Sequence, residues 1–135
     1  MKNLNSLDTA KQIIKNNWKE GFTIPSSKLY PFQWMWDSGF VALGTSTYNI
    51  EMAMTEIRKM FSGQWTNGMI PHILFHSENE KTYFPNFDFW KSQVNKGAPS
   101  KPKSSGITQP AVFGFIIQDI LKNNWGNEKA SKADR

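Results

Sequence analysis

The stretch Tyr30-Pro-Phe-Gln-Trp-Met-Trp-Asp37 places three aromatic side chains besides Tyr30, one amide and one carboxylate within eight residues. Such a stretch is unfavourable as a solvated surface and awkward as a plain apolar core. Aromatic rings that stack on sugar faces, beside groups that bind hydroxyls, are typical of carbohydrate pockets. The stretch therefore indicates a sugar site that lies where a loop leads into a helix.

The conformation of this stretch decides which of its side chains can act together. In a helix, Tyr30, Trp34 and Asp37 lie on one face. In an extended chain, Phe32, Trp34 and Trp36 share a face instead. The helical arrangement joins a phenol, an indole and a carboxylate, which suits a sugar. A core aromatic cluster with Asp37 as a helix N-cap explains the same residues equally well.

Hydrophobic periodicity predicts four helices along the chain. They cover Leu7 to about Glu20, a segment from Trp36 or Asp37 that Gly44–Thr47 breaks, Ile50–Phe61 capped by Asn49, and a segment from Pro110 that Asn123–Gly126 ends. The last helix is apolar around most of its circumference, so we expect it to be buried on most sides. We find no convincing strand and predict an incomplete all-α protein.

Two segments between these helices show no clean period and are predicted to be long loops. Gln64–Trp90 is rich in Gly, Pro, Asn and aromatic residues, which is typical of a functional loop. Val94–Gly106 is rich in Lys, Pro, Ser and Gly, and we expect it to be mobile.

Composition excludes several classes of protein. Hydrophobic residues make up 39% of the 135 residues, which is enough for a packed core. There is no cysteine, so a disulfide scaffold and a thiolate metal site are excluded. The first residues lack the apolar run of a signal peptide, and no segment approaches the roughly 20 apolar residues that cross a bilayer. We expect a cytoplasmic, soluble protein with no membrane partner.

The net charge is +5, and the basic residues that produce it lie mostly outside the segments rich in aromatic residues. Lys91, Lys96, Lys101 and Lys103 lie in a stretch without acidic residues. Nucleic-acid binding needs basic residues interleaved with stacking aromatics, and here the aromatics lie elsewhere. We therefore expect no nucleic-acid partner. The basic stretch is either a solvated loop or a lid whose charge attracts an anionic substrate.

Four motifs occur in a fixed order along the chain. They are Tyr30–Phe40, Gly68-Met-Ile-Pro-His72, Tyr83-Phe-Pro-Asn86 and Ser105-Gly-Ile-Thr-Gln-Pro110. In this order and spacing, from about Ser27 to Leu121, the chain resembles the mannosylglycerate and glucosylglycerate hydrolases of glycoside hydrolase family 63. The resemblance implies an all-α, six-hairpin α/α barrel (a toroid), of which residues 1–135 form the N-terminal part of a single domain. It also implies inverting hydrolysis of a small α-glycoside.

The resemblance implies a set of substrate-binding residues: Tyr30, Trp34, Asp37, His72, Tyr83 and Gln109. Trp90 is a further candidate beside the pocket. On the residues alone, His72 is as easily structural or exposed, and Gln109 an ordinary polar residue next to a helix cap. No second metal ligand lies at a suitable spacing from His72, so we expect neither a metal nor a cofactor. His76 matches nothing specific.

Inverting glycoside hydrolysis needs two carboxyl groups roughly 6.5–9.5 Å apart. Glu78 and Glu80 are expected to be solvated, whereas Asp88 lies among aromatic residues, where burial would raise its pKa. The resemblance places the general acid and base beyond Arg135. We therefore expect no catalytic residue in this chain, assign Asp37 to substrate binding, and predict that the chain alone is inactive.

Two other functions remain compatible with these residues. One is a trehalase-like or oligosaccharide α-glucosidase of the same barrel fold. The other is a sugar-binding remnant without chemistry. The expected partner is a small-molecule carbohydrate in each case, and the sequence leaves open a homo-oligomer.

Overall fold

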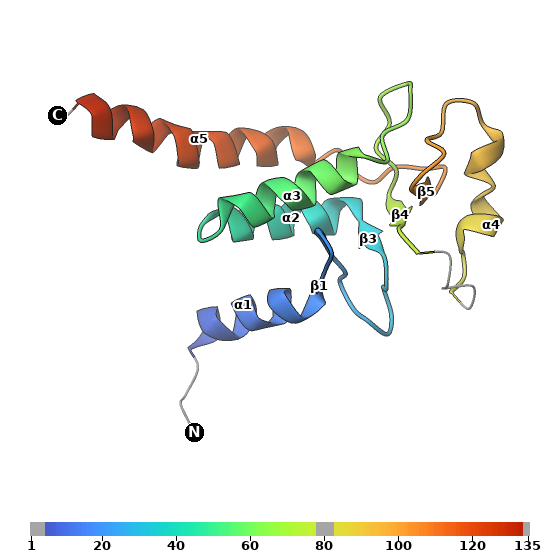
Figure 1. Ribbon diagram of the computed structural model, residues 1–135, viewed down its shortest axis with the longest axis horizontal. Coiled ribbons are helices and arrows are strands. Elements are labelled where there is room, and N and C mark those ends of the chain that lie inside the picture. Colours follow the sequence, from blue (N-terminus) through green and yellow to red (C-terminus); the bar gives the residue numbers. More distant parts are fainter. Residues whose placement is uncertain (1–4, 78–82, 134–135) are drawn as a thin grey trace.

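Three helices form the main layer of the molecule in the computed structural model, which describes residues 5–77 and 83–133. Helix α2 (Met35–Ser46) packs against α3 (Ile50–Phe61) and against α5 (Phe113–Ala133). Figure 1 shows α1 (Ser6–Asn17) below this layer, while α4 (Phe87–Trp90) lies at the opposite end from the C-terminus. The short 3-10 turn η1 (Ser92–Val94) follows α4.

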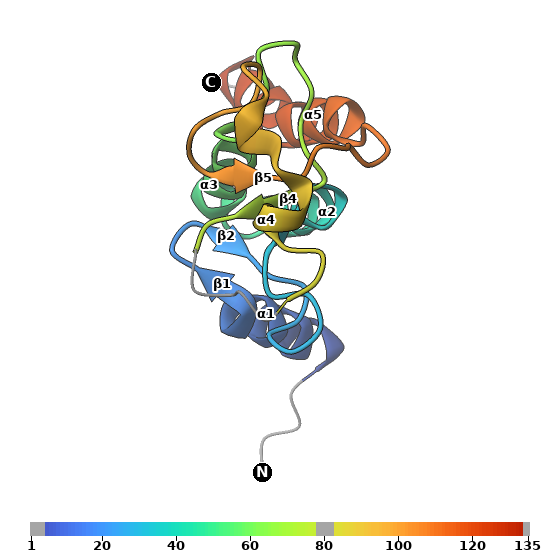
Figure 2. The same cartoon turned by 90° about the vertical axis from the view of Figure 1, so that its right-hand side faces the viewer.

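Two small antiparallel sheets accompany the helices. Strand β1 (Trp18–Lys19) pairs with β2 (Phe22–Thr23), and β3 (Gln33–Trp34), β4 (Ile73–Phe75) and β5 (Lys103–Ser104) form a second sheet in the order β3-β4-β5. Figure 2 looks onto the end of the molecule where β4, β5 and α4 meet. The all-α prediction is therefore correct only in part, since the chain is helix-rich but contains strands.

The sequence does not predict the strands, and the reason is physical. They are two or three residues long, which is too short for an alternating pattern. In β4 all three side chains are buried, so this strand has no polar face. Each of the two predicted loops therefore contains a strand: β4 lies within Gln64–Trp90 and β5 within Val94–Gly106.

The helix boundaries differ from the prediction at three of the four helices. Only Ile50–Phe61 is confirmed, with the Asn49 side chain accepting a hydrogen bond from the amide of Met52. Helix α1 ends at Asn17, because the chain turns back through Glu20 and Gly21, both with positive φ, to pair β1 with β2.

The other two helices extend beyond their predicted ends. Helix α2 begins at Met35 and continues through Gly44, and α5 begins at Phe113 and runs to Ala133. The N-cap of α2 is Trp34, so the interpretation of Asp37 as an N-cap is wrong.

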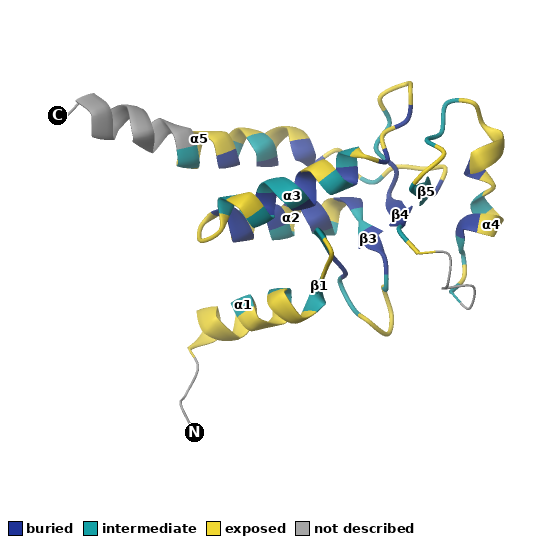
Figure 3. Cartoon of the chain, in the orientation of Figure 1, coloured by how far each residue is buried: buried dark blue, intermediate teal, exposed yellow. Residues whose placement is uncertain are grey.

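Apolar side chains of α2, α3 and α5, together with Leu74 of β4 and Val112 just before α5, form the main core. It contains Met35, Ala42, Ala53, Ile57, Met60, Leu74, Val112, Phe113, Ile116 and Ile120. The prediction that the last helix is buried on most sides is wrong, because Phe115 and Leu121 are exposed. Helix α1 contains no buried residue, and Figure 3 shows it as mostly exposed. Within the described ranges, no helix is long and apolar enough to cross a membrane.

Candidate functional site

Five ring-bearing residues assemble at the end of the three-stranded sheet, and we call them the aromatic wall: Tyr30, Trp34, His72, Tyr83 and Trp90. Their placement follows from the register of the sheet. Trp34 in β3 pairs with Ile73 in β4, which brings the Trp34 ring beside the preceding residue, His72. The ring centroids of Trp34 and His72 lie 5.3 Å apart, edge to face.

The wall continues on both sides of this contact. Tyr30 meets Trp34 with ring centroids 5.5 Å apart, and Trp90 meets His72 at 5.3 Å. Tyr83 packs edge to face on the buried Phe32 at 5.0 Å. Burial and the nearby phenol of Tyr30 raise the pKa of Tyr83. The Tyr83 hydroxyl is therefore a neutral donor near pH 7.

The environment of His72 favours a neutral ring. Nδ1 of His72 lies 2.5 Å from Oγ of Ser105, which also accepts from the amide of Ile73 at 3.2 Å. The Ser105 hydroxyl donates to the carbonyl of Ile107, so it accepts from Nδ1–H of His72. Nε2 of His72 is then left as an acceptor. Burial lowers the pKa of His72, and the Ile107 backbone opposes this shift.

The first turn of α2 is held by two of the predicted site residues. Its N-cap, Trp34, offers no side-chain acceptor. The amide of Met35 donates instead to the backbone carbonyl of His72 at 3.0 Å, and the amide of Trp36 donates to Oε1 of Gln109 at 3.0 Å. His72 and Gln109 therefore satisfy two of the free amides of this helix end.

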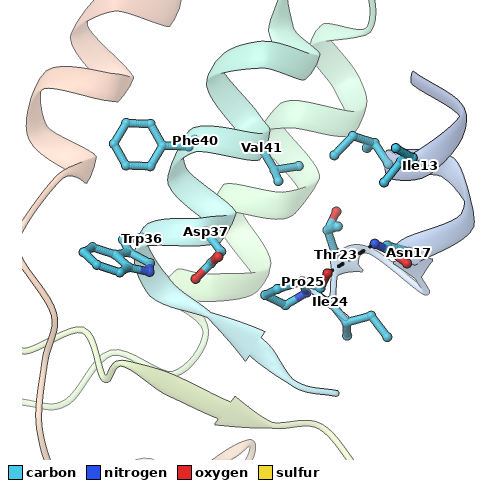
Figure 4. A pocket seen from close by; sticks show the side chains of 10 residues that line it. Ile13, Asn17, Thr23, Ile24, Pro25, Trp36, Asp37, Phe40 and Val41 are labelled. Atoms are coloured by element: carbon cyan, nitrogen blue, oxygen red, sulfur yellow. Dashed lines mark hydrogen bonds between the residues drawn. The ribbon is translucent and has the colours of Figure 1, made fainter. Parts of the chain in front are cut away.

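Asp37 lies in a separate pocket between α2, α1 and β2, with a volume of about 530 Å³. Figure 4 shows its carboxylate between Trp36 and Pro25, with α1 across the pocket. Burial raises the pKa of Asp37, while its own backbone amide and the Trp36 side chain oppose the shift. The structure thus brings Tyr30, Trp34, His72 and Tyr83 together, holds Gln109 on the end of α2, and places Asp37 one helical turn from Trp34.

Two donors of the aromatic wall have no acceptor among the described residues. Nε1 of Trp34 and Nε1 of Trp90 are buried without a hydrogen-bond partner in the part of the chain that the structure describes. A buried N–H group that has lost its water is costly unless an acceptor replaces that water.

A buried polar network that the sequence pattern did not predict lies on the α3 side of β3. Glu56 in α3 is fully buried, and its Oε1 accepts from Nε2 of Gln33 at 3.0 Å and from Oγ of Ser38 at 2.5 Å. Oε1 of Gln33 accepts from Nε2 of His76 at 2.7 Å, which gives His76 a structural contact that its sequence context did not indicate. A signal was present, because Glu56 interrupts the apolar stripe of Ala53, Ile57 and Met60.

The remaining carboxylate candidates do not form a catalytic pair among the described residues. Asp88 is exposed, so the expected burial of this group is wrong. Glu78 and Glu80 lie outside the described residues. No group of three or more His, Cys, Asp or Glu residues that could hold a metal occurs in the described ranges.

Comparisons with known proteins agree on one family. The family model for the mannosylglycerate hydrolase MGH1-like glycoside hydrolase domain matches residues 30–133. Mannosylglycerate hydrolase MGH2 of Selaginella moellendorffii is 41% identical over 118 residues, which are 87% of this chain and 23% of that protein. Glucosylglycerate hydrolase of Mycolicibacterium hassiacum is 35% identical over 125 residues, 92% of this chain and 28% of that protein.

Solved structures give the same result. The GH63 mannosylglycerate hydrolase of Thermus thermophilus in complex with Tris superposes with a TM-score of 0.76 and 36% identity, over 92% of this chain and 28% of that chain. Its complex with Tris and D-glycerate gives a TM-score of 0.73 and 37% identity, over 85% and 26%. The chain thus spans about a quarter of the length of these relatives.

The fold and these relatives place the chain among the glycoside hydrolases. Within that class, it belongs to the family of mannosylglycerate hydrolase MGH1-like proteins.

Proposed function

We propose that the aromatic wall forms one side of the sugar and glycerate pocket of an inverting hydrolase of mannosylglycerate or glucosylglycerate. The observation that carries the proposal is the contact of Trp34 and His72 at 5.3 Å, which Tyr30 and Trp90 extend into a continuous set of rings, with Nε2 of His72 left as an acceptor. Stacking rings next to free hydrogen-bonding groups suit a sugar with several hydroxyls. The names of the relatives support this substrate class.

Each predicted site residue has a role that its contacts allow. Tyr30 and Trp34 offer ring faces, and Nε2 of His72 accepts from a hydroxyl. Gln109 uses Oε1 for the amide of Trp36, so its NH2 group donates to an oxygen of the ligand. Tyr83 adds a phenol donor. Asp37, when ionised, accepts from sugar hydroxyls in its own pocket between α2, α1 and β2.

We propose further that residues 1–135 are part of a single α/α-barrel domain, whose other helices supply the general acid and the general base. The wall itself contains no carboxyl group, and the nearby Glu56 is fully buried and committed to Gln33 and Ser38. A water molecule activated by the base would be the nucleophile, and the reaction needs no cofactor.

Ligand titration of the 135-residue chain tests this function. Mannosylglycerate, glucosylglycerate, D-glycerate and trehalose are added separately while the indole N–H and His signals are followed by NMR. We expect the glycerate compounds to shift the signals of Trp34 and His72. A response to trehalose alone would favour a trehalase-like enzyme. No response of the Trp34 signal to any of the four, with the fold intact, would refute the proposal.

A further inference from the structure

One carboxyl group holds both flanks of the segment that carries Trp34 and Asp37. Oε1 of Glu56 accepts from Gln33, which directly precedes Trp34, and from Ser38, which directly follows Asp37. The Gln33 amide also donates to the backbone carbonyl of Glu56 at 3.2 Å. Gln33, Ser38 and Glu56 are all fully or almost fully buried.

The segment between these two anchors needs such support. Within Trp34–Asp37 the chain changes from strand β3 to helix α2 without a side-chain cap. The amides of Met35 and Trp36 depend on the His72 carbonyl and on Gln109, which come from distant parts of the sequence. Glu56 is therefore the contact that ties the strand end and the first helical turn to the same point of α3.

We propose that Glu56 is a positioning residue, which sets the orientation of Trp34 and Asp37 toward the ligand by binding Gln33 and Ser38 at once. Glu56 touches no ligand itself, and its effect passes through its two neighbours. The proposal rests on the function proposed above for the wall, but its structural part can be tested without any ligand.

The surroundings of Glu56 explain why a carboxyl group fits this position. A hydrogen bond from Gln33 and another from Ser38 occupy Oε1, whereas Oε2 is buried without a hydrogen-bond partner in the described structure, so the neutral acid carries its proton on Oε2. Oε1 keeps both contacts in the neutral and in the ionised form. The other titratable groups nearby are Asp37 on α2, His76 beyond Gln33, and Lys59 on α3 beside His76.

Two substitutions separate positioning from simple burial. Glu56→Gln keeps an oxygen in the position of Oε1 and removes the titration. Glu56→Leu keeps the size but leaves the Gln33 amide and the Ser38 hydroxyl without their acceptor. Ile57→Ala, next to Glu56 and buried in the main core, is the control for lost stability. Glu51→Gln, exposed on the same helix, is the control for lost charge.

The experiment measures two quantities in each variant of the 135-residue chain. The first is hydrogen exchange of the Met35 and Trp36 amides, together with the NMR shift of the Trp34 indole N–H, all without ligand. The second is the affinity for mannosylglycerate at equal folded fraction. We expect Glu56→Leu to speed the exchange of both amides, move the indole signal and weaken binding by about tenfold or more. Glu56→Gln, Glu51→Gln and Ile57→Ala should retain near wild-type affinity.

Each result decides one of the two proposals. Wild-type exchange and indole shift in Glu56→Leu would overturn the positioning role, whether or not the chain binds sugar. Equal loss of affinity in Glu56→Leu and Ile57→Ala would also overturn it, because stability alone would then explain the effect. If the wild type binds no glycerate compound while Glu56→Leu still changes exchange and shift, the function of the wall is wrong and the anchoring by Glu56 stands.

Discussion

His72 and Trp34 meet edge to face at 5.3 Å because the β3–β4 register pairs Trp34 with Ile73. The same backbone carries the carbonyl of His72 to the amide of Met35. One short pairing of strands therefore joins the ring of His72 to the start of α2. Four predictions test the structure around this contact.

Trp34→Ala should reduce the affinity for mannosylglycerate far more than Trp18→Ala. Trp34 contributes the ring that meets Tyr30 and His72, whereas the half-buried Trp18 lies in β1 and pairs with Thr23. Calorimetric titration at equal folded fraction gives both affinities, and chemical denaturation gives both stabilities. Similar losses of affinity in the two variants would contradict a binding role for Trp34.

Glycines on α2 should respond oppositely to alanine. A Cβ at Gly39 would lie 2.8 Å from Cδ1 of Ile116, whereas a Cβ at Gly44 meets nothing within 4 Å. Gly39→Ala should cost about 1–3 kcal/mol by overpacking against α5. Gly44→Ala should stabilise by about 0.5–1 kcal/mol, because alanine favours a helix interior. Urea denaturation measures both, and equal effects would show that α2 and α5 are not in close contact.

Glu56 should make stability depend on pH. Burial raises the pKa of Glu56 from 4.5 to about 7, so its folded form holds a proton that the unfolded form releases. Relative to Glu56→Gln, wild-type stability should be greatest below pH 4.5 and fall by about 3 kcal/mol as the pH rises to 7. Denaturation of both proteins across this range measures the difference. A difference independent of pH would mean that Glu56 is not buried as described.

His76 should show the opposite dependence. Burial first, and the charge of Lys59 second, lower the pKa of His76 from 6.5 to about 4. The stability that the neutral ring contributes is present above pH 6.5 and is lost as the pH falls toward 4. An NMR titration should place the His76 midpoint near 4, and Lys59→Met should raise it. A midpoint near 6.5 would show a solvated ring.

The sequence predicted the parts of this molecule that depend on local pattern. Ile50–Phe61 has an apolar face and an N-cap at Asn49, and both appear in the structure. The strands could not be predicted, because β3 and β5 have two residues each and their pairing joins distant segments. Their partners are set by tertiary packing rather than by period.

In the candidate site, too, the sequence predicted some residues, whereas others are recognised only from contacts between distant segments. The motif order drew attention to Trp34, His72 and Tyr83, and the structure gathers these rings in one wall. The roles of Ser105 and Glu56 depend on contacts across long stretches of sequence, so no local pattern identifies their partners. Glu56 gave only an indirect signal, as a charge within an apolar stripe.

The hydrogen bonds from His76 through Gln33 to Glu56 also fix the orientation of the Gln33 side-chain amide and the tautomer of His76. The Gln33 amide turns its NH2 group toward Glu56, so its oxygen faces His76 and requires a proton on Nε2. The neutral imidazole is thereby held as a single tautomer, chosen by a carboxyl group that it does not touch. The nitrogen-15 shifts of the half-buried His76 ring therefore report on the interior of the helical layer, from a position near its edge.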